Sequence, residues 1–397
     1  MRLLHTSDWH LGRTLHGHSR AREHEAFLDE LVEVAQDVDL VLIAGDVFET
    51  SNPPIEAEEL LFDALARLGD GGKRAVVVIA GNHDSPDRLA APRPLTTTHG
   101  VWILGRPGDV PRPRRGSGVE LLAGAPGTLT LSLPSGIAVV AALPYPSEAR
   151  LKQVLSTSIE ETDLQRAYEH RVREVLAAQA QAFRPDAVNV VTSHLSMTAC
   201  MPSSSERTLV GGAWQVAGDV LPAGTQYAAL GHLHLAQDVP DAPCLARYAG
   251  SPLHLRFSEK DHPRHHVLIE LEPGREPQVE LVPIAAGRPL VTWEVDGVAA
   301  LEAQVADGLH PDAFVDLAVR TPRRLTHAEI ARIKKLPRDI VKIRAILPEG
   351  SAPELESSGR RDLPLSEVFR AFYATQTNHD PDPELVRLFL ELAGESA

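Results

Sequence analysis

The chain has 397 residues, with 39 Lys and Arg against 54 Asp and Glu, and its formal net charge is −15. That balance argues against a nucleic-acid partner, unless basic residues gather on one surface or bound cations reverse the local field. Two cysteines, Cys200 and Cys244, exclude a disulfide framework, and no apolar run approaches the length of a membrane span. We therefore expect a cytoplasmic globular protein of roughly two or three domains.

Short apolar runs alternate with helical stretches from residue 1 to about residue 285. The runs rich in Val and Ile, typical of buried strands, are Val38–Ala44, Arg74–Ala80, Val188–Ser193 and Tyr227–Leu230. Apolar residues at helical spacing predict helices over Ala21–Gln36, Ile55–Leu68 and Leu164–Phe183. This alternation predicts an α/β domain over residues 1–285.

A second unit is predicted over residues 286–350. Its order is strand Leu290–Val295, helix Val298–Asp307, strand Ala313–Arg320, helix Thr326–Leu336 and strand Ile340–Leu347, which predicts a small α+β domain. Residues 351–397 begin with a polar stretch, Ser351–Asp362, that we interpret as a linker. Two amphipathic helices then follow over Pro364–Tyr373 and Pro383–Leu392, and their apolar faces could dock on the chain's own domains or in a partner's groove.

Residues of the type that ligate metals recur in a fixed order, most of them directly after a predicted strand. They are Asp8, His10, Asp46, Asn82, His194, His232 and His234. Asp, Asn and His supply the oxygen and nitrogen ligands that divalent transition metals take, and without cysteine the set does not choose among manganese, iron and zinc. Seven ligands are too many for one ion with an open position, but they suit two ions about 3.5–4 Å apart, an arrangement that clamps a phosphate ester for hydrolysis.

Each motif by itself is a weak signal. A D-x-H triplet such as Asp8-Trp9-His10 occurs by chance in many chains, and so does Gly45-Asp46. The joint occurrence and the order carry the prediction, because these side chains follow strands whose carboxyl ends converge in an open α/β sheet. Other histidines, such as His5 within the first predicted strand, are interpreted as structural.

The ordered set D-x-H, G-D, G-N-H-D, H and G-H-x-H resembles the calcineurin-like metallophosphoesterase superfamily. The segments HTSDWHLG, AGDVFETSNPP and AGNHDSPDRL, with Tyr248–Pro252, are similar to the SbcD family of bacterial nucleases. The resemblance implies a layered α/β sandwich with a capping domain and a helical tail that docks on an SbcC-like ATPase of the SMC/ABC type. It further implies a homodimer, a manganese-dependent nuclease acting on DNA in break repair and recombination, and a location with the nucleoid.

The resemblance also implies individual roles. Asp8, His10, Asp46 and His234 would hold one ion, and Asp46, Asn82, His194 and His232 the other, with Asp46 bridging. His83 would bind no metal and would face the scissile phosphate as the catalytic residue. Archaeal and eukaryotic relatives carry a second histidine where this chain has Glu49. A carboxylate cannot supply positive charge there, so Glu49 would orient a water or His83, or have no catalytic role.

Basic residues are concentrated in Arg320–Arg344, where nine Arg and Lys stand against Glu329 and Asp339. This stretch is either a solvated face or a phosphate-contact surface, and within it Arg323, Arg324, Lys334 and Lys335 are the predicted DNA contacts. Two other classes of function share some of these features. One is a two-metal phosphodiesterase or phosphatase for small substrates, which has no use for a basic capping domain or docking tail. The other is a non-catalytic scaffold, which the intact ligand set disfavours.

Overall fold

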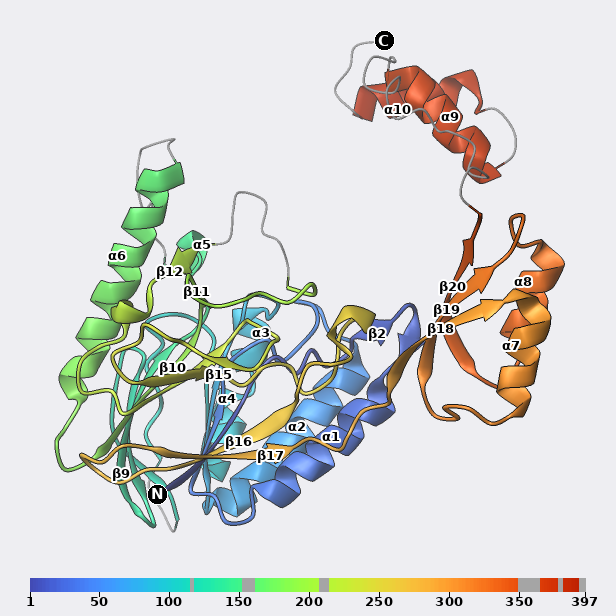
Figure 1. Cartoon of the computed structure of the whole chain (residues 1–397). Helices are drawn as coiled ribbons and strands as arrows, with labels where there is room; N and C mark the ends of the chain where they lie inside the picture. The colour runs from blue at the N-terminus through green and yellow to red at the C-terminus, as the bar shows by residue number, and fades with distance from the viewer. Residues whose placement is uncertain (115–117, 152–160, 207–213, 349–364, 378–380, 393–397) are drawn as a thin grey trace. The chain divides into compact units, whose positions relative to one another are not determined.

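The computed structural model describes residues 1–114, 118–151, 161–206, 214–348, 365–377 and 381–392 (Figure 1). The predicted linker Ser351–Asp362 lies outside these residues. The chain divides into two compact units, one of residues 1–293, 308–317 and 337–342, the other of residues 294–307, 318–336 and 343–397. Within the described ranges, no helix is long and apolar enough to cross a membrane.

The first unit is built on two large sheets. The first sheet has the strand order β17 (Gln278–Pro283), β16 (His265–Glu270), β1 (Arg2–Thr6), β4 (Leu40–Ile43), β5 (Ala75–Ile79) and β6 (Val101–Leu104). The second has the order β14 (Gln237–Asp238), β15 (Leu245–Tyr248), β13 (Tyr227–Gly231), β10 (Val188–His194), β9 (Gly136–Leu143), β8 (Thr128–Leu133) and β7 (Glu120–Ala125). The unit also contains two short pairs, β2 (Thr14–Leu15) with β3 (His18–Ser19) and β11 (Ser196–Met197) with β12 (Gln215–Val216).

Helices cover the outer faces of both sheets, which makes the unit a four-layer sandwich (Figure 1). The described α-helices of the unit are α1 (Ala21–Val34), α2 (Ile55–Gly69), α3 (Pro86–Ala90), α4 (Arg93–Thr96), α5 (Glu148–Leu151) and α6 (Glu161–Gln179). Apolar residues of α1 and α2 pack on the first sheet, and those of α6 pack on the second. Between the sheets lies a third apolar layer, to which β4 contributes Leu42 and β13 contributes Tyr227. The predicted layered α/β sandwich is therefore confirmed.

Strand register brings the ends of the central strands to one edge. β1, β4 and β5 are parallel, with Thr6 opposite Ile43 and Ile43 opposite Val78. In the second sheet β10 runs parallel to β13, with His194 opposite Gly231. Because parallel strands end together, the loops that follow them collect at one edge of each sheet.

The second unit contains the later residues of each strand of a three-stranded sheet, which consists of β18 (Leu290–Asp296), β19 (Phe314–Arg320) and β20 (Asp339–Ile346). It also contains α7 (Gly297–Ala306), α8 (His327–Lys334), α9 (Leu365–Thr377) and α10 (Pro383–Leu392). Helix α8 begins with a capping box, because Thr326 accepts from the backbone of Glu329 while the Glu329 carboxylate accepts from Thr326. Each helix and strand predicted for this region is present, and most of the observed ends lie within about two residues of the predicted ends. Helix α9 is longer than predicted, because it ends at Thr377 and not at Tyr373.

Helices α9 and α10 contact each other. The rings of Phe369 and Phe389 stack with centroids 4.2 Å apart. Phe372 and Leu388 remain 61% and 51% exposed, so part of the apolar surface expected from the sequence is left uncovered by the described residues.

Candidate metal centre

All seven predicted ligands lie at or just after the carboxyl ends of strands in the first unit. Asp8 and His10 follow β1, Asp46 follows β4, and Asn82 follows β5. In the second sheet His194 ends β10, while His232 and His234 follow β13. Six of the seven side chains are buried, and Asn82 is partly exposed.

Backbone strain concentrates in these loops. Among the described residues, seven non-glycine residues have positive φ, and four of them are predicted ligands: Asp8 (53°), His10 (48°), Asp46 (47°) and His232 (108°). Side chains other than glycine rarely adopt this region, and such strain persists where function requires it. Gly45, at φ 91°, is required for another reason, because a Cβ there would lie 2.5 Å from His194 Nδ1.

The first set of ligand atoms comes from Asp8, His10 and His234, which all lie within 4.8 Å of one another. His10 Nε2 is 3.1 Å from His234 Nε2 and 3.9 Å from Asp46 Oδ2. The Asp8 carboxylate also accepts the His232 backbone N–H at 3.1 Å, which ties the loop after β13 to the loop after β1.

The second set is centred on Asn82. Its Oδ1 lies 2.9 Å from both His194 Nε2 and His232 Nδ1. Asp46 Oδ2 is 3.5 Å from His194 Nε2. The Asp46 carboxylate therefore lies between a histidine of each set, where the predicted bridging ligand would have to be, and Asp8 is close to both sets because Asp8, Asp46 and His194 also fall within 4.8 Å.

The hydrogen bonds of these rings test whether the site fits cations. His194 Nδ1 donates to the Ala44 carbonyl at 2.8 Å, so Nε2 is the nitrogen that faces the oxygens of Asn82 and Asp46, and in the neutral ring it carries the lone pair. The Ser205 hydroxyl donates to Glu259 and so accepts from His234 Nδ1 at 2.5 Å, which leaves a lone pair on His234 Nε2 as well. Only a shared proton or a shared cation makes such a convergence of electron-pair donors favourable.

Distances also suit cations. Two ligand atoms held about 2.1 Å from one ion at a right angle lie about 3 Å apart, and the facing atoms here are separated by 3.1 and 2.9 Å. The residues present therefore fit a pair of divalent ions. This geometry supports the predicted dimetal centre, but it does not select manganese over other ions.

The electrostatic environment of the cluster favours bound positive charge, because the pKa values of two of its groups are raised. Burial by itself opposes protonation of His194, but the neighbouring Asp46 carboxylate raises the pKa of His194 to about 9. Burial raises the pKa of Asp8 to about 7, with the negative charge of Asp46 adding to the effect. Bound cations would supply this charge in place of protons.

His83 lies beside the two sets, on the loop after β5. Its backbone N–H donates to Asp46 Oδ1 at 2.8 Å, and its Nδ1 donates to the Glu49 carbonyl at 2.7 Å. The remaining nitrogen, Nε2, is 3.9 Å from Asp46 Oδ2. Burial, together with the charge of His10, lowers the pKa of His83.

Sequence reasoning gave no role to Asp84, although it is part of the GNHD motif. Its carboxylate accepts backbone N–H groups from Gly81 at 2.8 Å, Phe48 at 2.9 Å and Val47 at 3.2 Å. Arg150 clamps the same loop by donating to the carbonyls of Gly81 (2.6 Å) and Asp84 (2.7 Å). These contacts fix the loops that carry Asp46 and Asn82 in one geometry, and the acidic residue of the motif was the only signal for them in the sequence.

The histidine that was interpreted as structural, His5, is hydrogen-bonded within the core. It donates Nε2–H to the Leu230 carbonyl at 3.1 Å and accepts at Nδ1 from the Tyr227 hydroxyl at 2.9 Å.

The predicted DNA contacts Arg323, Arg324, Lys334 and Lys335 are exposed. Arg323 pairs with Glu329 at 2.9 Å, whereas the other three lie in no ion pair within the described part of the chain.

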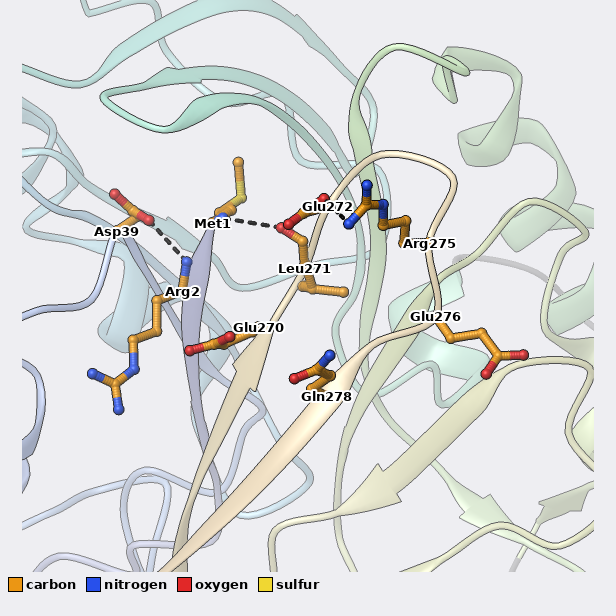
Figure 2. A pocket seen from close by; sticks show the side chains of 9 residues that line it. All are labelled: Met1, Arg2, Asp39, Glu270, Leu271, Glu272, Arg275, Glu276 and Gln278. Atoms are coloured by element: carbon orange, nitrogen blue, oxygen red, sulfur yellow. Dashed lines mark hydrogen bonds and ion pairs between the residues drawn. The ribbon is translucent and has the colours of Figure 1, made fainter.

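A separate hollow of about 360 Å³ lies at the opposite ends of the strands, beside the amino terminus (Figure 2). The Met1 amino group donates to the Leu271 carbonyl at 3.0 Å, and the Arg2 backbone N–H donates to Asp39 Oδ2 at 2.8 Å. Some of the polar groups that line this hollow are thus hydrogen-bonded within the protein. None of the predicted metal ligands lines it.

Comparison with known proteins agrees with this site. The family model for calcineurin-like phosphoesterases matches residues 1–234, a range that contains all seven predicted ligands. A Bacillus subtilis protein, the SbcD subunit of the nuclease SbcCD, is 39% identical over 400 residues, covering 99% of this chain and 98% of that protein. Proteins of the same name from Rhodobacter capsulatus and Escherichia coli K12 are 33% and 30% identical, covering 89% and 87% of this chain and 89% and 85% of their own lengths.

Identity at these levels over nearly full length extends beyond the metal loops to the second unit and the tail. The chain belongs to the calcineurin-like phosphoesterases and, within them, to the SbcD family of SbcCD nuclease subunits.

Proposed function

We propose that this chain is a manganese-dependent DNA nuclease that processes DNA breaks together with an SbcC-type ATPase. The observation that carries the proposal is the convergence of histidine lone pairs on the oxygens of Asp46 and Asn82, at the shared edge of two sheets. Relatives named as the SbcD subunit of the SbcCD nuclease support the DNA substrate and the ATPase partner. The oxygen and nitrogen ligand set, with no cysteine, is compatible with manganese.

In this proposal Asp8, His10, Asp46 and His234 hold one ion, and Asp46, Asn82, His194 and His232 hold the other. Two divalent ions held there would supply the positive charge that offsets the phosphodiester and would lower the pKa of an attacking water. His83 is the catalytic side chain, because its Nε2 is the ring nitrogen left without an internal acceptor and is directed at the cluster. There it contacts the phosphate or the leaving oxygen, and its backbone hydrogen bond to Asp46 keeps it beside the ions.

The rest of the chain serves substrate and partner. We assign residues 1–285 to the nuclease domain, 286–350 to a capping domain that contacts DNA, and 351–397 to a linker and ATPase-docking tail. Arg324, Lys334 and Lys335, exposed and without an ion pair in the described residues, support backbone contact with DNA, and Arg323 joins them by exchanging Glu329 for a phosphate. We assign the oligomeric state to a homodimer that forms a heterotetramer with the ATPase.

The test is degradation of linear duplex DNA and of hairpin ends by the purified full chain, with manganese and with excess chelator. We expect manganese-dependent cutting of both, and far slower cutting with His83→Ala. Cyclic nucleotides and a chromogenic phosphodiester are assayed alongside. Efficient turnover of those small substrates with intact DNA would identify a small-substrate phosphoesterase and overturn the proposal. Absence of turnover on every substrate, despite two bound ions, would do so as well.

A further inference from the structure

Glu49 occupies a position that links two loops of the site. It follows β4 by six residues, and its backbone N–H donates to the Leu11 carbonyl at 3.1 Å, in the loop that carries His10. Its side chain is 27% exposed. Glu49 is therefore fixed between the loop after β1 and the loop after β4.

The Glu49 carboxylate is fully committed to partners inside the site. Arg13 Nη1 donates to both carboxylate oxygens at 3.0 Å, and His10 Nδ1 lies 2.9 Å from Oε2. Although burial works in the opposite direction, hydrogen bonding to His10 and Arg13 lowers the pKa of Glu49 to about 2. A carboxylate in this position offers only acceptor atoms to Arg13 and to the His10 ring.

The backbone of Glu49 acts on a different histidine. Its carbonyl accepts the Nδ1 proton of His83 at 2.7 Å. One residue thus contacts two rings: its carboxylate lies 2.9 Å from Nδ1 of His10, a buried nitrogen with no other partner among the described residues, and its backbone carbonyl holds the proton on Nδ1 of His83. Both rings then present Nε2 toward Asp46, at 3.9 Å in each case.

We propose that Glu49, held by Arg13, is a positioning residue that orients His10 as a metal ligand and His83 toward the phosphate. The inference rests on the proposed dimetal site. A carboxylate behind a ligating imidazole fixes its tautomer and increases its basicity, and removing such a partner reduces metal affinity about 10–100-fold. His194 and His234, by contrast, are held by a carbonyl and a hydroxyl. The ion held by His10 is therefore the one that depends on Glu49.

The experiment is a titration of the metal-free full-length protein with manganese by calorimetry, for wild type, Glu49→Gln and Arg13→Gln. We expect two ions in the wild type. In Glu49→Gln one of them should bind about 10–100-fold more weakly, with the other unchanged. Arg13→Gln should weaken the same ion to a smaller extent, because the carboxylate remains but is no longer held. Unfolding midpoints establish that each variant is folded.

Nuclease rates separate positioning from catalysis. Because the backbone carbonyl is retained, His83 stays oriented in Glu49→Gln, so activity should return to near the wild-type rate at saturating manganese. Glu280→Gln is the matched control, since Glu280 also pairs with an arginine, Arg2, at 2.9 Å but on the edge strand β17. It should match the wild type in both assays.

Failure of the inference is distinguishable from failure of the proposed function. A wild-type protein that binds two ions and cuts DNA, combined with folded Glu49→Gln and Arg13→Gln variants of unaltered affinity for both ions, would overturn the positioning role alone. A rate that stays low in Glu49→Gln at saturating manganese would also overturn it, by placing the carboxylate in the chemistry. A wild-type chain without two ions or without nuclease activity would instead contradict the proposed function.

Discussion

His83 and Asp46 represent the two kinds of side chain in the centre. Asp46 is buried and accepts the backbone N–H of His83 at 2.8 Å, so the residue that we propose as catalytic is hydrogen-bonded to the proposed bridging ligand. The ring itself contributes a free Nε2 and no ligand bond in our assignment. Substitutions at these two positions should therefore have separable effects on metal content and on rate.

We expect His83→Ala to retain both ions and to lose about 10²–10⁴ in cleavage rate, the range for loss of a group that transfers a proton or stabilises charge. Rates at saturating manganese, with the metal content of the same sample, give the measurement. A variant that turns over near the wild-type rate would exclude the role.

Asp46→Ala should abolish cleavage and leave at most one tightly bound ion, because its carboxylate lies between a histidine of each set. Elemental analysis of the folded variant measures this. Asp46→Asn is the companion variant, since it can still accept the His83 N–H but lacks the charge. Two tightly bound ions in Asp46→Ala would contradict the bridging assignment.

At the scale of elements, β1 carries a titratable group into the core. Burial lowers the pKa of His5 to about 3, and both of its ring nitrogens are used by neutral partners on β13. Because the unfolded chain takes up a proton near pH 6.5 while the folded one does not, the free energy of unfolding falls as pH drops from about 6.5 toward 3.

The contribution of His5 should be about 1.4 kcal/mol per pH unit in that window. The substitution His5→Gln removes this contribution. When the pH falls from 6.5 to 5, the free energy of unfolding of the variant should therefore decrease by about 2 kcal/mol less than that of the wild type. Urea unfolding of metal-free protein at several pH values measures the slope. His170→Gln, on the exposed side of α6, should keep the wild-type slope. Parallel curves for His5→Gln and wild type would disprove the assignment.

The basic residues on and around α8 should bind phosphates without reading sequence. Changing Arg323, Arg324, Lys334 and Lys335 to Gln should weaken duplex binding and reduce the log–log salt slope by about 0.9 for each phosphate that is no longer neutralised. A control with the same charge change replaces Arg67, Lys73, Arg173 and Arg184, which all pair with acidic residues. An unchanged salt slope in the first variant, or an equal decrease of the slope in the control, would mean that these residues are exposed to solvent and do not contact DNA.

At the scale of the whole molecule, the tail and the metal centre belong to different compact units. Deleting residues from Leu363 onward should keep manganese-dependent cutting of simple DNA substrates and abolish co-purification with the SbcC-type ATPase. The double variant Phe372→Glu and Leu388→Glu tests the exposed apolar surface in the full chain and should have the same effect. A truncated chain that still forms a stable complex, or a folded one that no longer cuts DNA, would contradict this division of labour.

Local patterns were enough to predict much of the fold. The helix over Ile55–Leu68 was found as α2 at Ile55–Gly69, since Pro54 begins it and the left-handed Asp70 ends it. The antiparallel strands β7 to β9 were not predicted, and their pairing, such as that of β9 with β8, is a tertiary contact.

The sequence by itself determined which side chains gather at the site, because parallel strands end at one edge and each ligand follows its strand closely. Only the tertiary structure decided which nitrogen of each ring faces that edge. The partners responsible lie far away along the chain: Glu259 reaches His234 through Ser205, and the carbonyl of Glu49 lies 34 positions before His83. Hydrogen-bond acceptors at such separations leave no periodic signal in a sequence, so the roles of Glu49, Ser205 and Asp84 appear only when the loops are folded together.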